Sequence, residues 1–242
     1  MKLSKRVDWT AYAQAYDLMA SNNPAYQDIV HRLEIASNQW RIDPNDVMVD
    51  LGAGTGNLSC TLATRFPTCH VLHVDIDQGM NNAAYQKAVA GHMTNLHIVT
   101  QNIMELHLTS NSIASIVTVH ALYTLPNPIK VIHRMYEWLK PGGVIFACDL
   151  GRVLNVRSWA TYLFRESLKH RNVIRTLALF LRGRVVAQQN RRIVHSQLNG
   201  EYWTHDHSTY RTIFQQAGFL ISEAITCYRG DSDLVIASKP LA

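Results

Sequence analysis

The stretch VMVDLGAGTGNLS, Val47–Ser59, decides the fold. It begins with a short, almost continuous apolar run, 47–51, which is typical of a β-strand that is buried on both faces. Three glycines follow within five positions, Gly52, Gly54 and Gly56, and they let the backbone turn tightly into a helix. A buried strand, a glycine-rich turn and a helix indicate a doubly wound α/β sheet, in which ligands bind beyond the carboxyl ends of the strands.

Strands and helices continue to alternate after this turn. Apolar runs of strand length are separated by segments whose apolar residues recur at helical spacing, which predicts parallel strands with helices on both faces. The expected strands are 47–51, 70–76, 95–100, 112–120 and 144–150, and the expected helices are 55–66, 80–91 and 128–140.

The end of the chain departs from this alternation. A predicted helix, 208–219, precedes two strand-like runs, 220–228 and 233–238, and the short turn between these runs requires an antiparallel pair. We therefore expect one domain with a doubly wound, mostly parallel seven-stranded sheet and an antiparallel last strand. Its parts are an N-terminal helical lid, a cofactor-binding core, a basic helical insertion over the substrate, and a C-terminal helix with the strand pair, over residues 1–45, 46–150, 151–200 and 201–242.

Composition narrows the class of protein. The longest strongly apolar stretch, 173–181, is about nine residues long and contains Arg175, so it is too short and too charged to span a bilayer. The N-terminus shows no apolar segment of a secretory leader. The scattered cysteines favour free thiols in a reducing cytoplasm, and they are Cys60, Cys69, Cys148 and Cys227.

An acidic residue ends the second expected strand. Asp75 follows Gly52 by 23 residues, and a carboxylate there accepts hydrogen bonds from both hydroxyls of a ribose. The alternative is that the glycines only form a turn and that Asp75 caps the next helix. The spacing GxGxG differs from the GxGxxG of dinucleotide sites, and Asp50 repels a pyrophosphate but suits a cation. This pattern points to S-adenosylmethionine, which carries an ammonium and a sulfonium and no phosphate.

Several motifs together resemble those of class I S-adenosylmethionine-dependent methyltransferases of the small-molecule type. They are VMVDLGAGTG, VLHVDID, SIASIVTVHALYTLPNP and WLKPGGVIFACDL, within residues 47–150. The resemblance implies the fold, the cofactor and the transfer of a methyl group. It places the methionine portion on Asp50 and the glycine turn, the ribose on Asp75, and the adenine beside Asn102. The implied cofactor-binding residues of these segments are Asp50, Gly52, Ala53, Gly54, Gly56, Asp75, Ile76, Asn102, Ile103 and His120.

One motif position departs from the family pattern. The family more often has Asp at the position of Asn102, although the side-chain oxygen of Asn still accepts a hydrogen bond.

In the N-terminal segment, Tyr12 and Tyr16 are four residues apart and share a helical face. The resemblance implies a helix that closes over the cofactor with such a tyrosine, and the alternative is that both are ordinary core aromatics.

Methyl transfer from a sulfonium is a direct displacement, so the protein has to align the nucleophile, exclude water and in some cases remove a proton. His120, at the end of the fourth expected strand, and Tyr123 are the candidate catalytic residues. The alternative for His120 is a contact with the cofactor through its backbone alone. The candidate acceptor residues are Asp149, Tyr202, Trp203 and His205. No metal is expected, although His205 and His207 stand two apart.

The basic character of the chain is local. Residues 152–192 carry +9, whereas the rest of the chain carries −4. Arg171, Arg175 and Arg182 recur on one expected helical face, with apolar cover from Val173, Ile174, Leu177 and Phe180. Three interpretations stay open: a lid with a solvated outer face, a site for a carboxylate or phosphate of the substrate, and a surface that lies on an anionic membrane.

The expected acceptor is a small metabolite, anionic or amphipathic, that is methylated at O or N. Nucleic acid is not expected, because no RNA-binding module is visible and LPNPIK has Ile129 where an NPP-type motif has its second proline. The alternatives are a lipid or quinone methyltransferase at a membrane surface, a non-methylating enzyme that releases methylthioadenosine, and a catalytically silent binding subunit.

Overall fold

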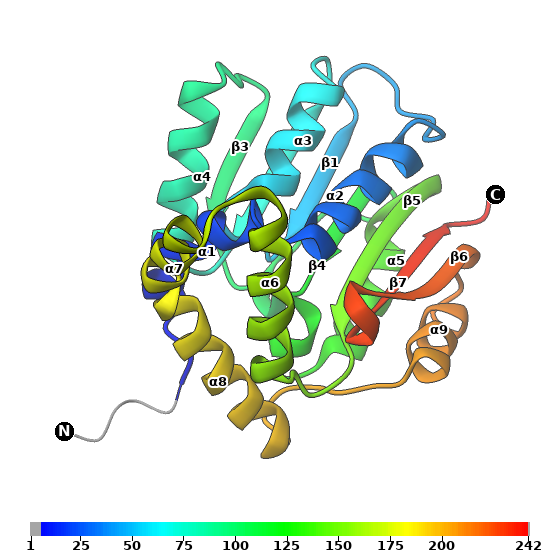
Figure 1. Cartoon of the computed structure of the whole chain (residues 1–242). Coiled ribbons are helices and arrows are strands. Elements are labelled where there is room, and N and C mark those ends of the chain that lie inside the picture. The colour runs from blue at the N-terminus through cyan, green and yellow to red at the C-terminus, as the bar shows by residue number, and fades with distance from the viewer. Residues whose placement is uncertain (1–5, 242) are drawn as a thin grey trace.

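The computed structural model describes residues 6–241. Seven strands in these residues form one sheet in the order β3-β2-β1-β4-β5-β7-β6, with helices on both faces (Figure 1). Neighbours from β3 to β5 are parallel, and β7 is antiparallel to both β5 and β6, so the predicted sheet is confirmed. The strands are β1 (Val47–Leu51), β2 (His70–Asp75), β3 (Leu96–Thr100), β4 (Ile113–Val119), β5 (Leu139–Leu150), β6 (Leu220–Cys227) and β7 (Ser232–Ser238).

The parallel centre of the sheet determines where the site lies. β1 pairs with β2 and with β4, so that Asp50 stands opposite His73 on one side and Val117 on the other. Because the three strands run in the same direction, their carboxyl ends meet at one edge of the sheet. That edge carries the glycine turn, Asp75 and His120.

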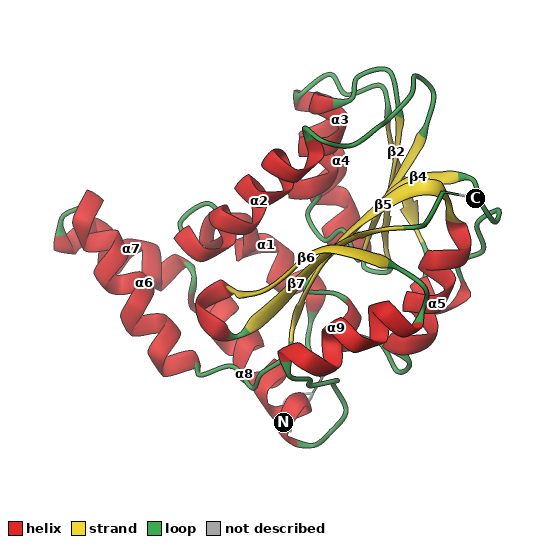
Figure 2. Ribbon diagram, turned by 90° about the vertical axis from the view of Figure 1, so that its right-hand side faces the viewer, coloured by secondary structure: helices red, strands yellow, loops and turns green. Residues whose placement is uncertain are grey.

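Each face of the sheet has its own apolar core. On one face α5 (Pro128–Trp138) and α9 (His207–Gln216) pack on the strands, and α2 (Pro24–Ser37), α3 (Asn57–Arg65) and α4 (Gln78–Ala90) cover the other (Figure 2). Helix side chains buried in the two cores include Val131, Ile132, Met135, Tyr210 and Phe214 on the first face, and Ile29, Leu33, Leu58, Leu62 and Ala88 on the second.

Three element boundaries differ from the sequence-based expectation. α5 ends at Trp138 and β5 begins at Leu139, so the sequence PGG, expected to separate them, lies inside the strand. β4 ends at Val119, and His120 follows it with a φ of +54°. The backbone amide of His120 nevertheless donates to the Cys148 carbonyl at 2.8 Å, which keeps this residue tied to β5.

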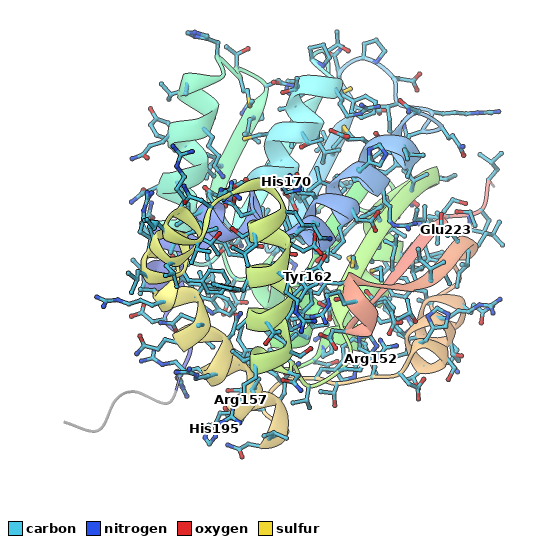
Figure 3. All side chains as sticks on the ribbon, in the orientation of Figure 1. Arg152, Arg157, Tyr162, His170, His195 and Glu223 are labelled. Atoms are coloured by element: carbon cyan, nitrogen blue, oxygen red, sulfur yellow. The ribbon has the colours of Figure 1, made fainter. Side chains whose placement is uncertain are left out.

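The basic insertion folds into three helices, α6 (Val156–His170), α7 (Val173–Arg182) and α8 (Arg184–Leu198). Figure 3 shows Arg157, Tyr162 and His170 along α6. The expectation of one helical face with Arg171, Arg175 and Arg182 is wrong, because Arg171 lies in the break between α6 and α7. The break forms because the Asn172 side chain caps α7 by accepting from the Arg175 amide at 2.9 Å.

The expected apolar cover on α7 is also largely wrong. Val173, Ile174 and Leu177 are 55%, 78% and 49% exposed. Phe180 alone of the four packs inward, with its ring centroid 5.5 Å from that of Phe164. None of the helices in residues 6–241 is long and apolar enough to cross a bilayer.

The turn after β1 sets the distance between two helices. Gly56 precedes α3 with a φ of +81°, and a Cβ atom there would lie 2.8 Å from the Cβ of Ala84 in α4. A contact this short is not seen between real side chains, so Gly56 is required by packing as well as by its backbone conformation.

We expect Gly56→Ala to lower the free energy of unfolding by about 3 kcal/mol or more, because it adds a steric clash to the cost of a positive φ. The matched control is Gly200→Ala. Gly200 has a φ of +71° with nothing within 4 Å of the added Cβ, so only about 1 kcal/mol should be lost there. Urea unfolding of both variants measures the difference, and equal losses would contradict the packing role of Gly56.

Candidate active site

A cavity of about 400 Å³ lies at the carboxyl edge of the sheet. Its floor is formed by the ends of β1, β2 and β4, and α1 (Trp9–Ala20), α6 and α8 contribute to its walls. Of the predicted cofactor residues, those that line it are Tyr12, Tyr16, Asp50, Gly52, Ala53, Gly54, Asp75, Ile76, Asn102, Ile103 and His120. Gly56 does not line the cavity and packs α3 against α4, so its assignment to the cofactor stays a prediction.

The glycine turn brings backbone close to the cavity. Gly52 and Gly54 have φ values of +65° and +56°, which favour glycine. A Cβ atom on Gly52 would lie 2.3 Å from the Cβ of Ala121, so no side chain fits there. The space beside Gly52 is thus filled by Ala121, whereas a Cβ atom on Gly54 would meet only Met80 Sδ at 3.9 Å, so the turn presents bare backbone at the cavity.

Asp75 is oriented by the backbone of this turn. Its Oδ2 atom accepts from the Gly54 amide at 2.8 Å, and Oδ1 accepts from the Asp77 amide at 2.9 Å. The cap of α4 is Asp77, which accepts from the Met80 amide, so the alternative role of Asp75 as the helix cap is wrong. Each carboxylate oxygen of Asp75 keeps a second lone pair, which suits the two hydroxyls of a ribose.

Asp50 is buried at the end of β1 and begins a chain of polar side chains below the cavity. Its Oδ2 atom lies 2.6 Å from Ser59 Oγ, and Ser59 Oγ lies 2.9 Å from His73 Nδ1. His73 Nε2 in turn lies 3.0 Å from Asn81 Oδ1. Burial raises the pKa of Asp50 to about 7 and lowers the pKa of His73 to about 4.

The proton positions in this chain follow from its far end. Asn81 Nδ2 donates to the Asp75 carbonyl, which can only accept, so Asn81 Oδ1 accepts from His73 Nε2. A neutral imidazole then presents Nδ1 as an acceptor toward Ser59 Oγ, 2.9 Å away. Ser59 Oγ donates to Asp50 Oδ2, and burial of the Asp50 carboxyl group favours its neutral form. Without a cation beside it, Asp50 therefore stays protonated up to a pH of about 7.

This arrangement fits S-adenosylmethionine. An ammonium beside Asp50 favours the carboxylate and so expels the proton of the buried acid. Asp75 suits the ribose, and the glycine turn provides an open backbone. At the adenine end, the Asn102 side chain accepts from the Met104 amide at 3.0 Å and thereby shapes its own turn, while Ile76 is 61% exposed at the cavity.

The roof of the cavity is formed by the N-terminal helix. The Tyr12 hydroxyl donates to Asn190 Oδ1 of α8 at 2.8 Å, and the Thr10 hydroxyl donates to Asp77 Oδ2 at the same distance. The Tyr12 and Tyr16 rings meet edge to face at 5.3 Å between centroids. These contacts hold α1 across the cavity, between α4 and α8.

The candidate catalytic residues His120 and Tyr123 both line the cavity. His120 Nε2 lies 2.9 Å from Ser232 Oγ, and burial lowers the pKa of His120 to about 3. The imidazole is therefore uncharged at neutral pH. Tyr123 is almost fully buried, and its ring meets Tyr202 edge to face at 5.4 Å. The catalytic assignment of these two residues stays a prediction.

Of the candidate acceptor residues, only Tyr202 lines the cavity. Asp149 is buried outside it, where its carboxylate lies against the backbone amides of residues 121–123 without a hydrogen bond of full geometry. Burial raises the pKa of Asp149 well above its usual value. Trp203 and His205 also lie outside, because the Trp203 amide donates to the Tyr123 carbonyl and directs the chain past the cavity.

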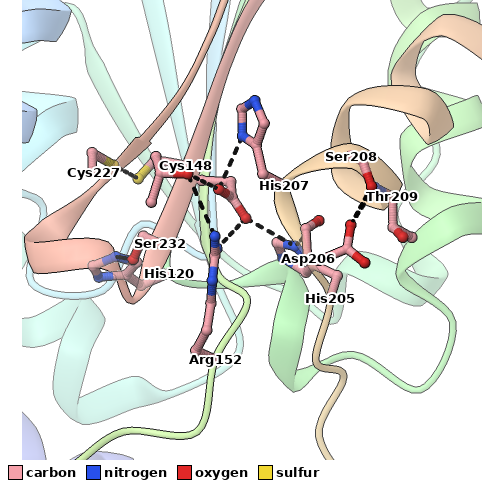
Figure 4. Close-up of polar contacts among 12 residues, drawn as sticks. His120, Cys148, Arg152, His205, Asp206, His207, Ser208, Thr209, Cys227 and Ser232 are labelled. Atoms are coloured by element: carbon pink, nitrogen blue, oxygen red, sulfur yellow. Dashed lines mark hydrogen bonds and ion pairs between the residues drawn. The ribbon is translucent and has the colours of Figure 1, made fainter.

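His205 and His207 serve a structural cluster. Figure 4 shows Arg152, His205 and His207 converging on one carboxylate, that of Asp233 in β7. Burial opposes ionisation of Asp233, but hydrogen bonds from His205 and Arg152 lower its pKa to about 2. Arg152 and both histidines therefore pair with the same carboxylate.

Several cavity residues were missed by the sequence reasoning. Trp159 and Ile193 lie in the basic insertion, which the sequence analysis interpreted by its arginine and lysine residues. Tyr228 follows the end of β6. Trp159 Nε1 donates to Asp231 Oδ2 at 2.6 Å, and the Trp159 and Tyr228 ring centroids are 4.4 Å apart. The further lining residues that were missed include Trp9, Asn23, Tyr26, Leu154, Leu163 and Asn190.

Comparison with known proteins identifies a domain in the part of the chain that carries the candidate cofactor residues. Residues 48–143 match the family model described as a methyltransferase domain. Residues 48–143 therefore form a methyltransferase domain, and the sheet around it has the fold of the class I S-adenosylmethionine-dependent methyltransferases. It is 37% identical over 102 residues to trans-aconitate 2-methyltransferase of Deinococcus radiodurans, which covers 42% of this chain and 37% of that protein.

Two further similarities extend the comparison of this chain. It is 27% identical over 120 residues to demethylmenaquinone methyltransferase of Listeria monocytogenes, which covers 49% of this chain and 50% of that protein. The chain thus spans half or less of the length of these two relatives. Phosphoethanolamine N-methyltransferase 2 of Haemonchus contortus, solved with S-adenosylhomocysteine, has the same fold, with a TM-score of 0.59 and 15% identity over 87% of this chain and 52% of that one.

The protonation of Asp50 generates a prediction about cofactor affinity. Because the cation binds the carboxylate, the Kd for S-adenosylmethionine should fall about tenfold per pH unit between about pH 5 and pH 7, and level off above the Asp50 pKa of about 7. Isothermal titration in buffers of different ionisation enthalpy should also show proton release on binding.

Asp50→Asn is the matched variant, and it should bind about 10- to 100-fold more weakly with no pH dependence below pH 7. Ser59→Ala should move the midpoint to higher pH, because the Ser59 hydrogen bond lowers the pKa of Asp50. An unchanged pH profile in Asp50→Asn would contradict the assignment of the proton to this carboxyl group.

Proposed function

We propose that this methyltransferase transfers the methyl group of S-adenosylmethionine to an oxygen or nitrogen atom of a small, uncharged acceptor with a planar apolar ring. The observation that carries the proposal is the composition of the cavity beyond the cofactor residues. Its walls include Trp159, Tyr202 and Tyr228 with Leu154 and Ile193. Among the described residues that line the cavity, none is Lys or Arg.

The sequence analysis expected an anionic or amphipathic acceptor, and the side chains of the cavity wall favour an uncharged one. Anionic substrates are usually held by Arg or Lys in a fork or point-charge contact, and such groups are missing from the described lining. Flat aromatic walls with a few polar atoms suit a ring that stacks against them. A tricarboxylate would lack a partner here. The relative named for demethylmenaquinone agrees better with this wall than the relative named for trans-aconitate does.

S-adenosylmethionine supplies an electrophilic methyl group when it is bound, so the chain has to position the acceptor and exclude water. Asp50, Asp75 and the glycine turn would hold the cofactor from the floor of the cavity. The roof, with Tyr12 bonded to Asn190, covers the cavity on one side. Trp159 is fixed in place by its hydrogen bond to Asp231, which orients its ring along the cavity wall. These contacts align a nucleophile with the methyl group.

In this proposal His120 orients the acceptor by a hydrogen bond and does not act as a general base. Ser232 engages one nitrogen of its imidazole, and the other is left to orient a hydroxyl or amine. An imidazole with a pKa near 3 is a weak base, so the acceptor should lose its proton to water or after methyl transfer.

The function is tested by incubating the chain with S-adenosylmethionine and matched aromatic alcohols, amines and carboxylates. We expect S-adenosylhomocysteine with phenolic or amine rings and little with ring carboxylates. Release of methylthioadenosine, or preference for the carboxylates, would contradict the proposal. Trp159→Ala should raise KM for the ring about 10- to 100-fold with the cofactor Kd unchanged, and Trp159→Phe should restore most of the affinity.

A separate measurement addresses His120. With saturating cofactor, the turnover of the wild type should show no inflection from an imidazole between about pH 5 and pH 8, since the neutral form persists above about pH 3. His120→Gln keeps a polar contact for Ser232 and should lose less than about tenfold in kcat. A loss of about 100-fold or more together with an inflection in the wild type would instead identify His120 as a general base.

A further inference from the structure

The outward face of α7 is apolar. Val173, Ile174, Leu177 and Leu181 are 55%, 78%, 49% and 69% exposed, and their spacing places them on one side of the helix. A helix on the outside of a globular protein normally presents polar side chains on that side. Here the usual arrangement is reversed, since the exposed side of α7 is aliphatic.

The inward side of α7 is already occupied by contacts within the insertion. The buried Thr176 and Ser167 hydroxyls lie 3.0 Å apart, and Phe180 packs against Phe164 of α6. The helix is therefore docked on α6 by its other side. No other part of the insertion covers the exposed aliphatic side chains. They are therefore available to an external surface.

Cationic side chains border this aliphatic face. Arg175 and Arg182 lie at its margin on α7, and further Lys and Arg residues stand at the ends of the neighbouring helices. Glu166 is paired with Lys169 at 2.7 Å, and residues 167–200 contain no Asp or Glu. The further cations are Arg165, Lys169, Arg171 and Arg184.

The face is also connected to the cavity through α6. Trp159 and Leu163 of this helix line the cavity, and Leu168 near its other end is 38% exposed. Figure 2 shows α6 and α7 projecting at one side of the molecule, remote from α5 and α9. A surface that covers α7 would lie beside the helix that forms one wall of the site.

We propose that α7, with the end of α6, binds the surface of an anionic lipid bilayer. An aliphatic strip with arginines at its margin matches the acyl and headgroup layers of such a surface at the same time. A second copy of the chain would bring two sets of like charges together, and a nucleic acid would place phosphates against the aliphatic strip. Of these three partners, only the anionic bilayer matches both the aliphatic strip and the arginines at its margin.

Bilayer binding does not rest on the identity of the acceptor, and it has a consequence for the proposed function. An apolar acceptor partitions into the bilayer, so a docked enzyme meets it at a higher local concentration. The acceptor can then approach the cavity along α6. The interaction would be peripheral, because a single short amphipathic helix lies in the interface and does not span it.

Flotation of the full chain with lipid vesicles tests the proposal. We expect binding to mixed phosphatidylcholine and phosphatidylglycerol vesicles, little binding to phosphatidylcholine alone, and a loss of binding as salt is raised. Ile174→Ser with Leu181→Ser should reduce partitioning at least about tenfold. Arg175→Gln with Arg182→Gln should reduce it about 30-fold.

Matched controls lie elsewhere on the surface. Leu220→Ser, at a residue that is 59% exposed on β6, and Arg211→Gln, at an exposed residue of α9, should leave partitioning unchanged. Equal losses in these controls, or no binding of the wild type to anionic vesicles, would overturn the proposal. So would a dimer in sedimentation velocity that the Ile174→Ser and Leu181→Ser variant dissolves. Retained S-adenosylmethionine affinity verifies folding, and a failure of methyl transfer alone would leave lipid binding measurable.

Discussion

The structure depends on burying an ionisable carboxyl group, Asp50, at the end of its central strand. A buried charge is costly unless it is paired, so the neutral acid is the stable form until a cation arrives. The polar groups around the buried acid also need hydrogen-bond partners. The polar chain through Ser59, His73 and Asn81 supplies these partners without introducing a charge. The Asp50 end of the candidate cofactor site is thus prepared for a positive ligand while this carboxyl group itself remains uncharged.

The rest of the site is arranged around this floor from segments that are far apart in the sequence. The parallel strands bring Asp50, Asp75 and His120 to one edge, and the insertion after β5 returns with Trp159 and Asn190 to form walls. The cluster at Asp233 fixes the beginning of that insertion, since Arg152 pairs with the same carboxylate as His205 and His207. The strand ends hold the candidate cofactor residues, whereas the helices hold the walls of the proposed acceptor site.

The cofactor half was readable from the sequence because its signals are local. Strand periodicity, the glycines and Asp75 each act within a few residues of their own position, and the buried β1 and β4 have the apolar runs that this position demands. The acceptor half was less predictable, because a side chain after β5 can point to the cavity, to the core or to solvent. Asp149 illustrates this, since it stands at a strand end and yet faces backbone amides.

The three-helix insertion shows where pattern reading fails in physical terms. The spacing of the arginines and aliphatic residues predicted one helical face of arginines with apolar cover, but the Asn172 cap breaks the segment before Val173. After that break, Thr176 and Phe180 take the inward positions and the aliphatic residues turn outward. A cap residue inside a basic run was the available signal, and it outweighs periodicity because it starts a new helix in a new direction.

The hydrogen bond between Tyr12 and Asn190 joins residues 178 positions apart in the chain. A second bond of the same kind, from the Asp8 amide to Gln189, spans 181 positions. Contacts of such long range close the largest loops, so they form after the local strand and helix pairs are in place. During synthesis the sheet edge with Asp50 and Asp75 would emerge long before its roof can close. The order of folding therefore leaves the floor of the cavity open first, and the roof closes over it last.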